Sequence, residues 1–432
     1  MTAPTPPPAL RRTAIASLVG TAIEWYDFFI YGTASVLVFA PQFFPGASDL
    51  AGTLAAFSTL AVGFLARPLG GALMGHFGDR VGRKSMLVLS LLLMGTATFA
   101  IGLLPTYAQI GAWAPILLVL LRFLQGFGVG GEWGGAVLLA VENAPPGKRG
   151  FYGSFPQMGV PAGVILSNVV FLIILGTAGK QAFTEWAWRL PFLFSIVLVI
   201  AGLLVRSKIG ETPEFTKVRS AGVQRSPLAS VIRKHPKQIL LAGGTFLANN
   251  AIGYVMIVYM LSYGTKTLKL TQNTMLTLVL IASGVWLVTL PLFSALSDRV
   301  GRRKVFTAGG LVLLVWSIPF FLLLDTVSTP LMVISVVVTA LGLSATYGPQ
   351  AALFAELFDA DVRYSGASLG YQLGAIFGGG FAPFIAAWLQ GATGSSVWVG
   401  VYLTVLAVIS LVCISLLREP ARQAVEAVPQ PA

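Results

Sequence analysis

The chain consists of long apolar runs separated by short polar segments. An α-helix needs about 20 apolar residues to cross the hydrocarbon core of a bilayer, and twelve runs approach or exceed that length. They cover residues 13–40, 52–77, 84–105, 112–141, 150–177, 188–206, 238–262, 273–296, 303–325, 329–356, 364–390 and 396–417. The pattern predicts an all-α membrane protein with twelve transmembrane helices.

Composition supports this class and narrows it. Only 10% of the 432 residues are charged, against about 25% in a soluble domain. The net charge of +12 does not indicate nucleic-acid binding, because the basic residues fall in short loops and at the ends. The sequence contains no nucleotide-binding P-loop and no metal-ligand cluster, so we expect neither an enzyme nor a cofactor. The single cysteine, Cys413, excludes an intrachain disulfide.

The longest polar interruption lies near the middle of the chain and divides the runs six and six. We therefore predict two six-helix bundles, at residues 13–206 and 238–417, joined by a cytoplasmic linker at 207–237. The Pro-rich N-terminus, residues 1–12, and the C-terminal tail, residues 418–432, are expected to be disordered.

Basic residues are distributed unequally between the two sides of the predicted membrane. If the N-terminus is cytoplasmic, the inside segments hold 22 of the 28 Lys and Arg residues. The outside loops then hold four, which are Lys180, Arg189, Lys266 and Lys269. Because cytoplasmic loops carry an excess of Lys and Arg, both termini are predicted to be cytoplasmic.

Two motifs recur at a nearly constant offset. GHFGDRVGRK at 75–84 returns as SALSDRVGRRK at 294–304, with Asp79 and Asp298 separated by 219 residues. The spacing of Glu142 and Arg149 returns in Glu356 and Arg363, 214 residues later. The two halves are therefore predicted to be homologous and related by an axis along the membrane normal. Such an arrangement places a substrate site near the bilayer midplane, between the bundles.

These motifs resemble the major facilitator superfamily, whose loop between helices 2 and 3 carries D-R-x-G-R-[KR]. The stretches EWYDF (24–28), FLARPLGG (64–71), RFLQGFGVGGEWGG (122–135) and RSKIGETPEF (206–215) are similar to the metabolite:proton symporter family. Members of that family carry organic acids such as shikimate and 2-oxoglutarate, or zwitterions such as proline and betaine. The likeness to shikimate and related organic-acid transporters rests further on RYSGASLGYQ and GGGFAPFIAA, late in the chain.

Five ionisable residues lie inside the predicted spans, namely Glu24, Asp27, Arg67, Arg122 and Glu132. A charge at mid-bilayer costs roughly 2.5–3.5 kcal/mol on insertion scales, so such groups usually face a cavity or a partner. Spacing i, i+3 puts Glu24 and Asp27 on one helix face. Two carboxylates in a low-dielectric site resist ionising together, so this pair could hold a proton.

The resemblance implies a role for these acids together with Arg122. In related sugar carriers, an acid on helix 1 and an arginine on helix 4 couple transport to protons. We therefore assign proton coupling to Glu24, Asp27 and Arg122, with protons as the coupling ion. The alternative is a static salt bridge that holds helices 1 and 4 together.

Arg67 is the first candidate for substrate binding, because a planar guanidinium pairs bidentately with a carboxylate. The alternative is that it serves a gate. Other polar groups inside the spans could line the same cavity, although each could instead form a helix–helix hydrogen bond. They are Tyr26, Tyr31, Gln157, Asn249, Asn250, Tyr254, Tyr347, Gln350, Tyr371 and Gln372; the tandem Asn249 and Asn250 are favoured among them.

The charged residues of the repeated motifs are interpreted as gating residues. The resemblance implies that this loop ties helices together on the cytoplasmic side in the outward-open state. The set is Asp79, Arg80, Arg83, Asp298, Arg299 and Arg302, with Glu142–Arg149 and Glu356–Arg363 as inner-face salt bridges. The alternative, topology alone, does not explain the aspartates, since acids contribute little to orientation. Glu132 is expected to act in gating, or else as a second proton site.

These observations lead to one functional hypothesis and its rivals. The chain is expected to be a monomeric, proton-coupled symporter in the cytoplasmic (inner) membrane of a bacterium, with the lipid bilayer, protons and a small organic acid as its partners. It would import that acid by alternating access of its two bundles. The rivals are a proton-coupled importer of zwitterions, a proton-driven drug exporter, and a transport-inactive receptor.

Overall fold

The computed structural model describes residues 8–81, 83–130, 132–207, 227–359 and 362–417. The first half contains α1 (Pro8–Ala34), α2 (Ala40–Phe43), α3 (Asp49–Val81), α4 (Arg83–Leu103), α5 (Tyr107–Ile110), α6 (Trp113–Val129), α7 (Glu132–Glu142), α8 (Arg149–Glu185) and α9 (Leu190–Ser207). The second half contains α12 (Pro236–Tyr254), α13 (Met260–Lys266), α14 (Gln272–Val300), α15 (Arg302–Asp325), α16 (Thr329–Glu356), α17 (Arg363–Gly374), α18 (Ala382–Thr393) and α19 (Val397–Leu416). A short helix, α11 (Pro227–Lys234), precedes α12.

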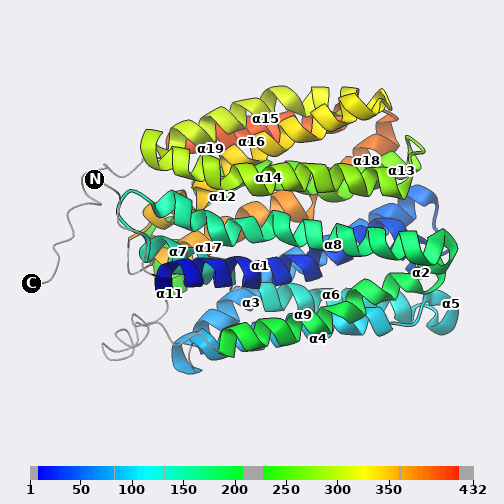
Figure 1. Cartoon of the computed structure of the whole chain (residues 1–432), viewed down its shortest axis with the longest axis horizontal. Coiled ribbons are helices and arrows are strands. Elements are labelled where there is room, and N and C mark those ends of the chain that lie inside the picture. The colour runs from blue at the N-terminus through cyan, green and yellow to red at the C-terminus, as the bar shows by residue number, and fades with distance from the viewer. Residues whose placement is uncertain (1–7, 82, 131, 208–226, 360–361, 418–432) are drawn as a thin grey trace, which may run out of the picture.

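Each predicted span coincides with a helix or with a series of joined helices (Figure 1). Ten described helices are long and apolar enough to cross a membrane, Val88–Leu103 is a shorter apolar helix, and α1, which carries the two carboxylates, completes the twelve. The predicted fold class is therefore confirmed. One boundary differs from the prediction, because α1 already begins at Pro8, inside the segment expected to be disordered.

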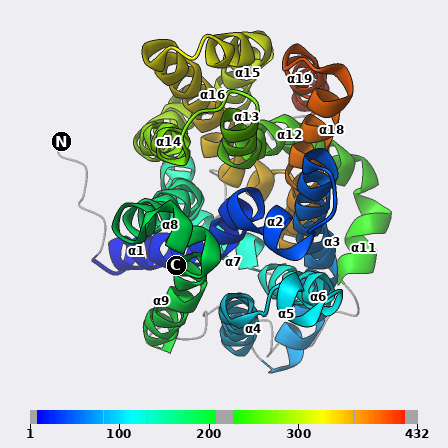
Figure 2. The same ribbon diagram turned by 90° about the vertical axis from the view of Figure 1, so that its right-hand side faces the viewer.

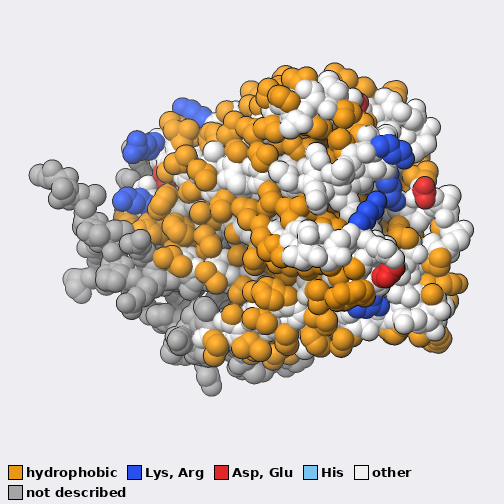
Figure 3. Space-filling view, turned by 45° about the vertical axis from the view of Figure 1, so that its right-hand side comes forward, with side chains coloured by type: hydrophobic (Ala, Val, Ile, Leu, Met, Phe, Trp, Pro, Cys, Tyr) orange, Lys and Arg blue, Asp and Glu red, His pale blue; other side chains and the backbone are white. Residues whose placement is uncertain are grey.

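The outer surface has the polarity that a bilayer requires. In Figure 3 hydrophobic side chains cover the middle of the visible face, whereas Lys, Arg, Asp and Glu side chains gather toward its two ends. Many large apolar side chains of the described residues are exposed, such as Leu120, Val288 and Val315. Because lipid tails tolerate such side chains and penalise charges, the helices are expected to run across the membrane.

The two halves lie side by side, and their long helices run along a common direction (Figures 1 and 2). Helices α8 and α14 pack along each other across the boundary between the halves, and α3 packs against α18 and the segment that precedes it. The boundary therefore runs between two layers of helices, which is where the sequence predicts a substrate site.

Three spans contain a turn of π-helix instead of α-helix. These π segments are Ser35–Phe39 after α1, Val255–Tyr259 after α12 and Ala375–Gly380 after α17. The first two occupy equivalent places in the two halves, since they begin 220 residues apart. π-Helical turns inside helices are rare and occur frequently at functional sites.

Glycine allows α3 and α6 to approach closely. A Cβ atom at Gly126 would overlap the carbonyl group of Gly63, and one at Gly70 would overlap that of Phe127. Backbone atoms cannot rotate away as a side chain can, so these positions exclude larger residues. The close approach matters for function, because Arg67 lies on α3 and Arg122 on α6.

We expect Gly126→Ala to destabilise the protein by about 1–3 kcal/mol, the usual cost of overpacking. Its Cβ would force α3 and α6 apart at Gly63. Thermal melting of the purified protein in detergent measures the effect. Gly284→Ala is the matched control, since open space surrounds a Cβ at that position. Equal melting temperatures for the two variants would contradict this account of the packing.

Candidate functional site

The aromatic ring of Phe28 lies between two buried arginines. The guanidinium carbon of Arg122 lies 3.9 Å from the centre of the Phe28 ring, and that of Arg67 lies 4.4 Å from it. Arg122 also contacts the ring of Tyr31 at 4.2 Å, and Arg67 contacts Phe64 at 4.4 Å. Cation–π attraction strengthens when the groups are desolvated. The aromatic residues of the first span thus provide the surface on which both cations rest.

Asp27 is fully buried, yet among the described residues neither of its carboxylate oxygens has a hydrogen-bond partner. The Nε and Nη2 atoms of Arg122 are likewise buried without a partner in the described part of the chain. The remaining nitrogen, Nη1, donates a hydrogen bond to Gln125. The ion pair between the first and fourth spans (α1 and α6) that the sequence suggested is therefore not formed in this conformation, so the static salt bridge is not observed here.

A narrow pocket opens beside this cluster, at the boundary between the halves. Thr21, Glu24 and Trp25 line it from α1, Arg67 from α3, Trp133 from α7, and Tyr371 and Gln372 from α17. It is barely large enough for one water molecule. Four predicted residues, Glu24, Arg67, Tyr371 and Gln372, thus share one pocket, whereas Asp27 is not among its lining residues.

Aromatic stacking closes this pocket on one side. The ring of Trp133 stacks on that of Tyr371 with centroids 3.9 Å apart, and Tyr371 stacks on Phe246 at 4.5 Å. The indole nitrogen of Trp133 donates to the Oε1 atom of Gln157 at 2.9 Å. Gln157 in turn donates to the carbonyl oxygen of Tyr347 at 3.1 Å, across the boundary. These contacts join the two halves.

Three predicted substrate residues instead bond within one half. The hydroxyl of Tyr26 donates to the carbonyl oxygen of Pro191, and that of Tyr31 donates to Thr59. The side chain of Asn249 donates to the carbonyl oxygen of Leu343 and to the hydroxyl of Thr346. These three residues thus form helix–helix hydrogen bonds in this conformation, and their role in substrate binding stays a prediction.

The other predicted residues lie near the boundary. Gln372 donates to the carbonyl oxygen of Gly130, and the hydroxyls of Tyr347 and Tyr371 are 3.5 Å apart.

The ring of Tyr254 packs against Phe28, Phe29 and Phe64. Among the described residues, the hydroxyl of Tyr254 and both amide atoms of Gln350 have no hydrogen-bond partner. Asn250 is buried beside Gly378 and Gly379.

Asp298 connects the two halves at one end of the molecule, which we call the Asp298 end. Its carboxylate accepts hydrogen bonds from the backbone nitrogens of Gly150 (2.8 Å) and Phe151 (2.9 Å). These nitrogens belong to the first turn of α8, where the helix dipole favours an anion. Arg302 forms an ion pair with the same carboxylate at 2.6 Å, and a second ion pair with Glu356 at 3.4 Å.

The glutamates at the Asp298 end are paired differently from the sequence prediction. Arg363 forms an ion pair with Glu142 of the other half at 3.2 Å, and Glu356 lies within electrostatic reach of Arg149. The predicted pairs joined residues seven apart within each half, whereas these interactions cross the boundary. Arg299 is exposed nearby. The side chains of Asp79, Arg80, Arg83 and Glu132 lie outside the described residues.

The Glu142–Arg363 ion pair can be tested by exchanging its charges. We expect Arg363→Glu to place two like charges together and to weaken closure of the Asp298 end, while adding Glu142→Arg restores it. The pair is about one-third exposed, so the change should be modest, on the order of 1 kcal/mol. Disulfide cross-linking of cysteines introduced on α7 and α17 measures closure. A double variant no better than Arg363→Glu would show that the pair does not contribute.

Two residues that join helices were not identified from the sequence. At the opposite end, the ammonium group of Lys266 on α13 donates to the hydroxyl of Thr53 on α3 at 2.6 Å, again across the boundary. In the sequence, Lys266 served only to assign orientation. Gln125, the partner of Arg122, is an uncharged residue inside an apolar run, and its polarity is the only signal that could have indicated it.

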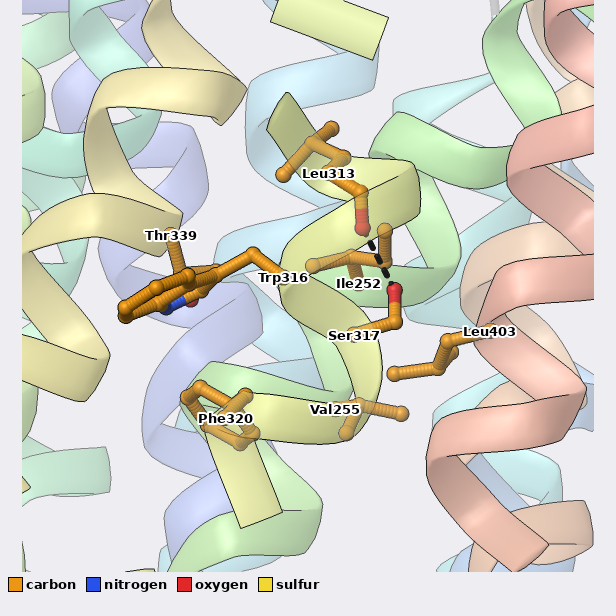
Figure 4. Close-up of a pocket in the computed structure, with 8 residues that line it drawn as sticks. All are labelled: Ile252, Val255, Leu313, Trp316, Ser317, Phe320, Thr339 and Leu403. Atoms are coloured by element: carbon orange, nitrogen blue, oxygen red, sulfur yellow. Dashed lines mark hydrogen bonds between the residues drawn. The ribbon is translucent and has the colours of Figure 1, made fainter. Parts of the chain in front are cut away.

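A second pocket lies inside the second half (Figure 4). Its lining is apolar except for the hydroxyls of Ser317 and Thr339 and the indole nitrogen of Trp316. Ser317 donates to the carbonyl oxygen of Leu313, and Thr339 and Trp316 both bond to that of Ser335. Because its polar groups are already paired, this pocket offers nothing to bind a charged solute.

The arrangement defines a membrane carrier: two six-helix halves, a polar pocket between them, and bonds across the boundary at both ends. The chain belongs to the major facilitator superfamily, since the sequence-family model described as Major Facilitator Superfamily matches residues 17–369.

Comparisons with individual proteins agree. The chain is 44% identical over 425 residues to the inner membrane metabolite transport protein YhjE of Escherichia coli (strain K12), covering 97% of this chain and 96% of that protein. It is 45% identical over 382 residues to the shikimate transporter of the same organism, covering 87% of each. A crystal structure of the D-xylose-proton symporter has a TM-score of 0.73 over 96% of this chain and 98% of that one. At 18% identity, it shows the fold alone.

These findings confirm the predicted family and class. The chain is a multi-pass transporter of the bacterial inner membrane and not an enzyme. The cytoplasmic location of both termini stays a prediction from the distribution of basic residues.

Proposed function

We propose that the protein imports a small organic acid together with protons. The observation that carries this proposal is the pair of buried guanidinium groups, Arg67 and Arg122, that have no carboxylate partner within the described residues. An unpaired buried charge is costly, so a site that presents one selects a ligand of opposite charge. Arg67 lines the pocket, and a carboxylate could accept two parallel hydrogen bonds from it.

Asp27 is the proposed proton carrier. An ionised carboxylate without partners is unfavourable in a low-dielectric interior, so a proton that binds Asp27 relieves this cost. Arg122 is the cation that would stabilise the ionised form after the proton leaves. Glu24, inside the pocket, would lie next to the substrate. With one proton per monoanion the cycle is electroneutral, and the pH gradient alone drives uptake.

Alternating access would use the bonds at the two ends of the boundary in turn. The Asp298 contacts would help to close one end, and the Lys266–Thr53 hydrogen bond would help to close the other. Following the distribution of basic residues, we place the Asp298 end and both termini in the cytoplasm, with residues 207–237 as the linker between two bundles of a monomer. Opening either end requires the bonds there to break and the packing between the halves to separate.

A zwitterion importer is the second candidate, and one observation favours it. Glu24 and Arg67 line the same pocket, so the site presents a carboxyl group as well as a guanidinium. A ligand with both an ammonium and a carboxylate would match this pair. It would depend less on the second arginine than an anion does.

Proteoliposomes loaded with a pH-sensitive dye test the proposal. Internal and external pH are matched, and shikimate, 2-oxoglutarate, an aromatic acid, proline and betaine are added separately, with protein-free liposomes as the control for passive entry. Interior acidification by an acid supports acid symport, and acidification by proline or betaine supports the zwitterion candidate. Alkalinisation would contradict symport, and binding without any flux would favour a receptor.

A further inference from the structure

The amide of Gln125 joins three helices at the centre of the first half. Its side chain is completely buried on α6, three residues after Arg122. The Oε1 atom accepts a hydrogen bond from Nη1 of Arg122. The Nε2 atom donates to the backbone oxygen of Asp27 at 3.0 Å and to the hydroxyl of Thr98 at 2.8 Å. This orientation of the amide follows from its partners, since a guanidinium can only donate and a carbonyl oxygen can only accept.

Gln125 therefore links Arg122 to the backbone of Asp27, while the two ionisable groups themselves are not paired. It binds the guanidinium of Arg122 and the backbone of Asp27, while the Asp27 carboxylate has no partner among the described residues. The aromatic rings of Phe28 and Tyr31 hold the other side of the same guanidinium. An ion pair would satisfy both groups, but in this conformation Arg122 donates to Gln125 and rests on the two rings instead.

We propose that Gln125 is a positioning residue, which in this conformation holds the Arg122 guanidinium against Phe28 and Tyr31 and thereby keeps it from pairing with the Asp27 carboxyl group. Asp27 then stays available to bind a proton here, and Arg122 would pair with it only in the conformation that releases the proton. The inference rests on the proposed proton coupling.

Other charged or titratable groups near this site are Glu24 on the same helix, Arg67 from α3 and Tyr254 from the other half. From α4 the uncharged Thr98 faces Asp27 and Gln125.

Two substitutions separate this role from simple packing. Gln125→Met keeps the length and shape of the side chain but removes every hydrogen bond, so Arg122 becomes free to turn to Asp27. Gln125→Glu keeps an acceptor for Arg122 and should hold the guanidinium in place. Ser90→Ala is the matched control, because it removes another buried hydrogen bond between α4 and α6, from Ser90 to the carbonyl oxygen of Gly128.

A double-mutant cycle in thermal melting needs no substrate. In the native protein, Asp27→Asn removes an unpaired buried carboxyl group and should leave the melting temperature unchanged or raise it. In the Gln125→Met background the same change removes a new ion pair and should lower the melting temperature. In Gln125→Glu and Ser90→Ala it should behave as in the native protein. Non-additivity of this kind reports a direct interaction between sites. The same effect of Asp27→Asn in every background would overturn the proposal.

Transport provides the second measurement, with the acid that acidifies the proteoliposomes as the probe. Gln125→Met should lose accumulation driven by a proton gradient while retaining exchange of labelled for unlabelled solute, and Gln125→Glu should retain more accumulation than Gln125→Met. Equal loss of accumulation and exchange would indicate a structural role and overturn the inference. If none of the compounds is transported, the proposed function fails, and the melting cycle still decides whether Gln125 keeps the two charges apart. If Gln125→Met does not fold, the Gln125→Glu background is used instead. A lower melting temperature after Asp27→Asn is added to that background would overturn the inference.

Discussion

Replacing Asp27 with asparagine should abolish proton-driven accumulation of the substrate while leaving exchange across the membrane intact. Asparagine has nearly the shape of aspartate but cannot carry a proton, so the carrier could still reorient but could not couple. With a pH gradient of one unit and one proton per solute, the native protein should accumulate substrate about tenfold. The variant should stop at equal concentrations. Uptake of labelled acid into proteoliposomes measures both quantities.

Glu24→Gln is the comparison that makes this result specific. Glu24 lies one turn earlier on the same helix but lines the pocket, so its loss should alter substrate binding more than coupling. If Glu24→Gln abolishes accumulation and Asp27→Asn does not, the proton carrier is Glu24. If both variants accumulate substrate as the native protein does, neither acid couples transport.

Arg67→Gln should weaken binding of an organic anion by about 30- to 1,000-fold. Removing one partner of a buried, hydrogen-bonded charge pair costs about 2–4 kcal/mol, and each 1.4 kcal/mol is a factor of ten. Glutamine keeps a polar side chain of similar reach but neither the charge nor the planar fork. Isothermal titration of the purified protein with the transported acid measures the dissociation constant.

Arg67→Lys distinguishes charge from geometry at this position. Lysine keeps the charge but not the bidentate fork, so an intermediate loss of affinity is expected. A dissociation constant that Arg67→Gln leaves unchanged would show that the guanidinium does not bind the substrate. A zwitterion that binds Arg67→Gln as well as the native protein would support the second candidate function.

Much of the fold could be predicted from local patterns. Span length and hydrophobicity are properties of single segments, and the recurrence of the Asp79 and Asp298 motifs directly indicates two related halves. Small adjustments at helix ends were not predictable: α1 starts at Pro8, and α8 reaches Glu185 across a break at Gly179. Short helical stretches beyond the bilayer carry no hydrophobic signal.

The site could be predicted only in part. Glu24, Asp27, Arg67 and Arg122 were identified because a charge inside a span needs an explanation, and the structure places both arginines on Phe28. Which charges pair was not predictable, because pairing depends on how the halves meet. The ion pair of Arg363 with Glu142 shows this. Arg363 of the second half pairs with the glutamate of the first half and not with the glutamate of its own motif.

The π segments in the first and seventh spans have a mechanical consequence. Each carries one residue more than the α-helical turn that it would replace, and one residue corresponds to a rotation of about 100° around the helix axis. If such a segment relaxed to α-helix, every side chain beyond it would turn by that angle relative to the part before it. Ser35–Phe39 and Val255–Tyr259 occupy matching places in the two halves. The two spans therefore contain equivalent points of rotation. At each of them the part of the span after the π segment could turn, while the arginine cluster beside Phe28 stays in place.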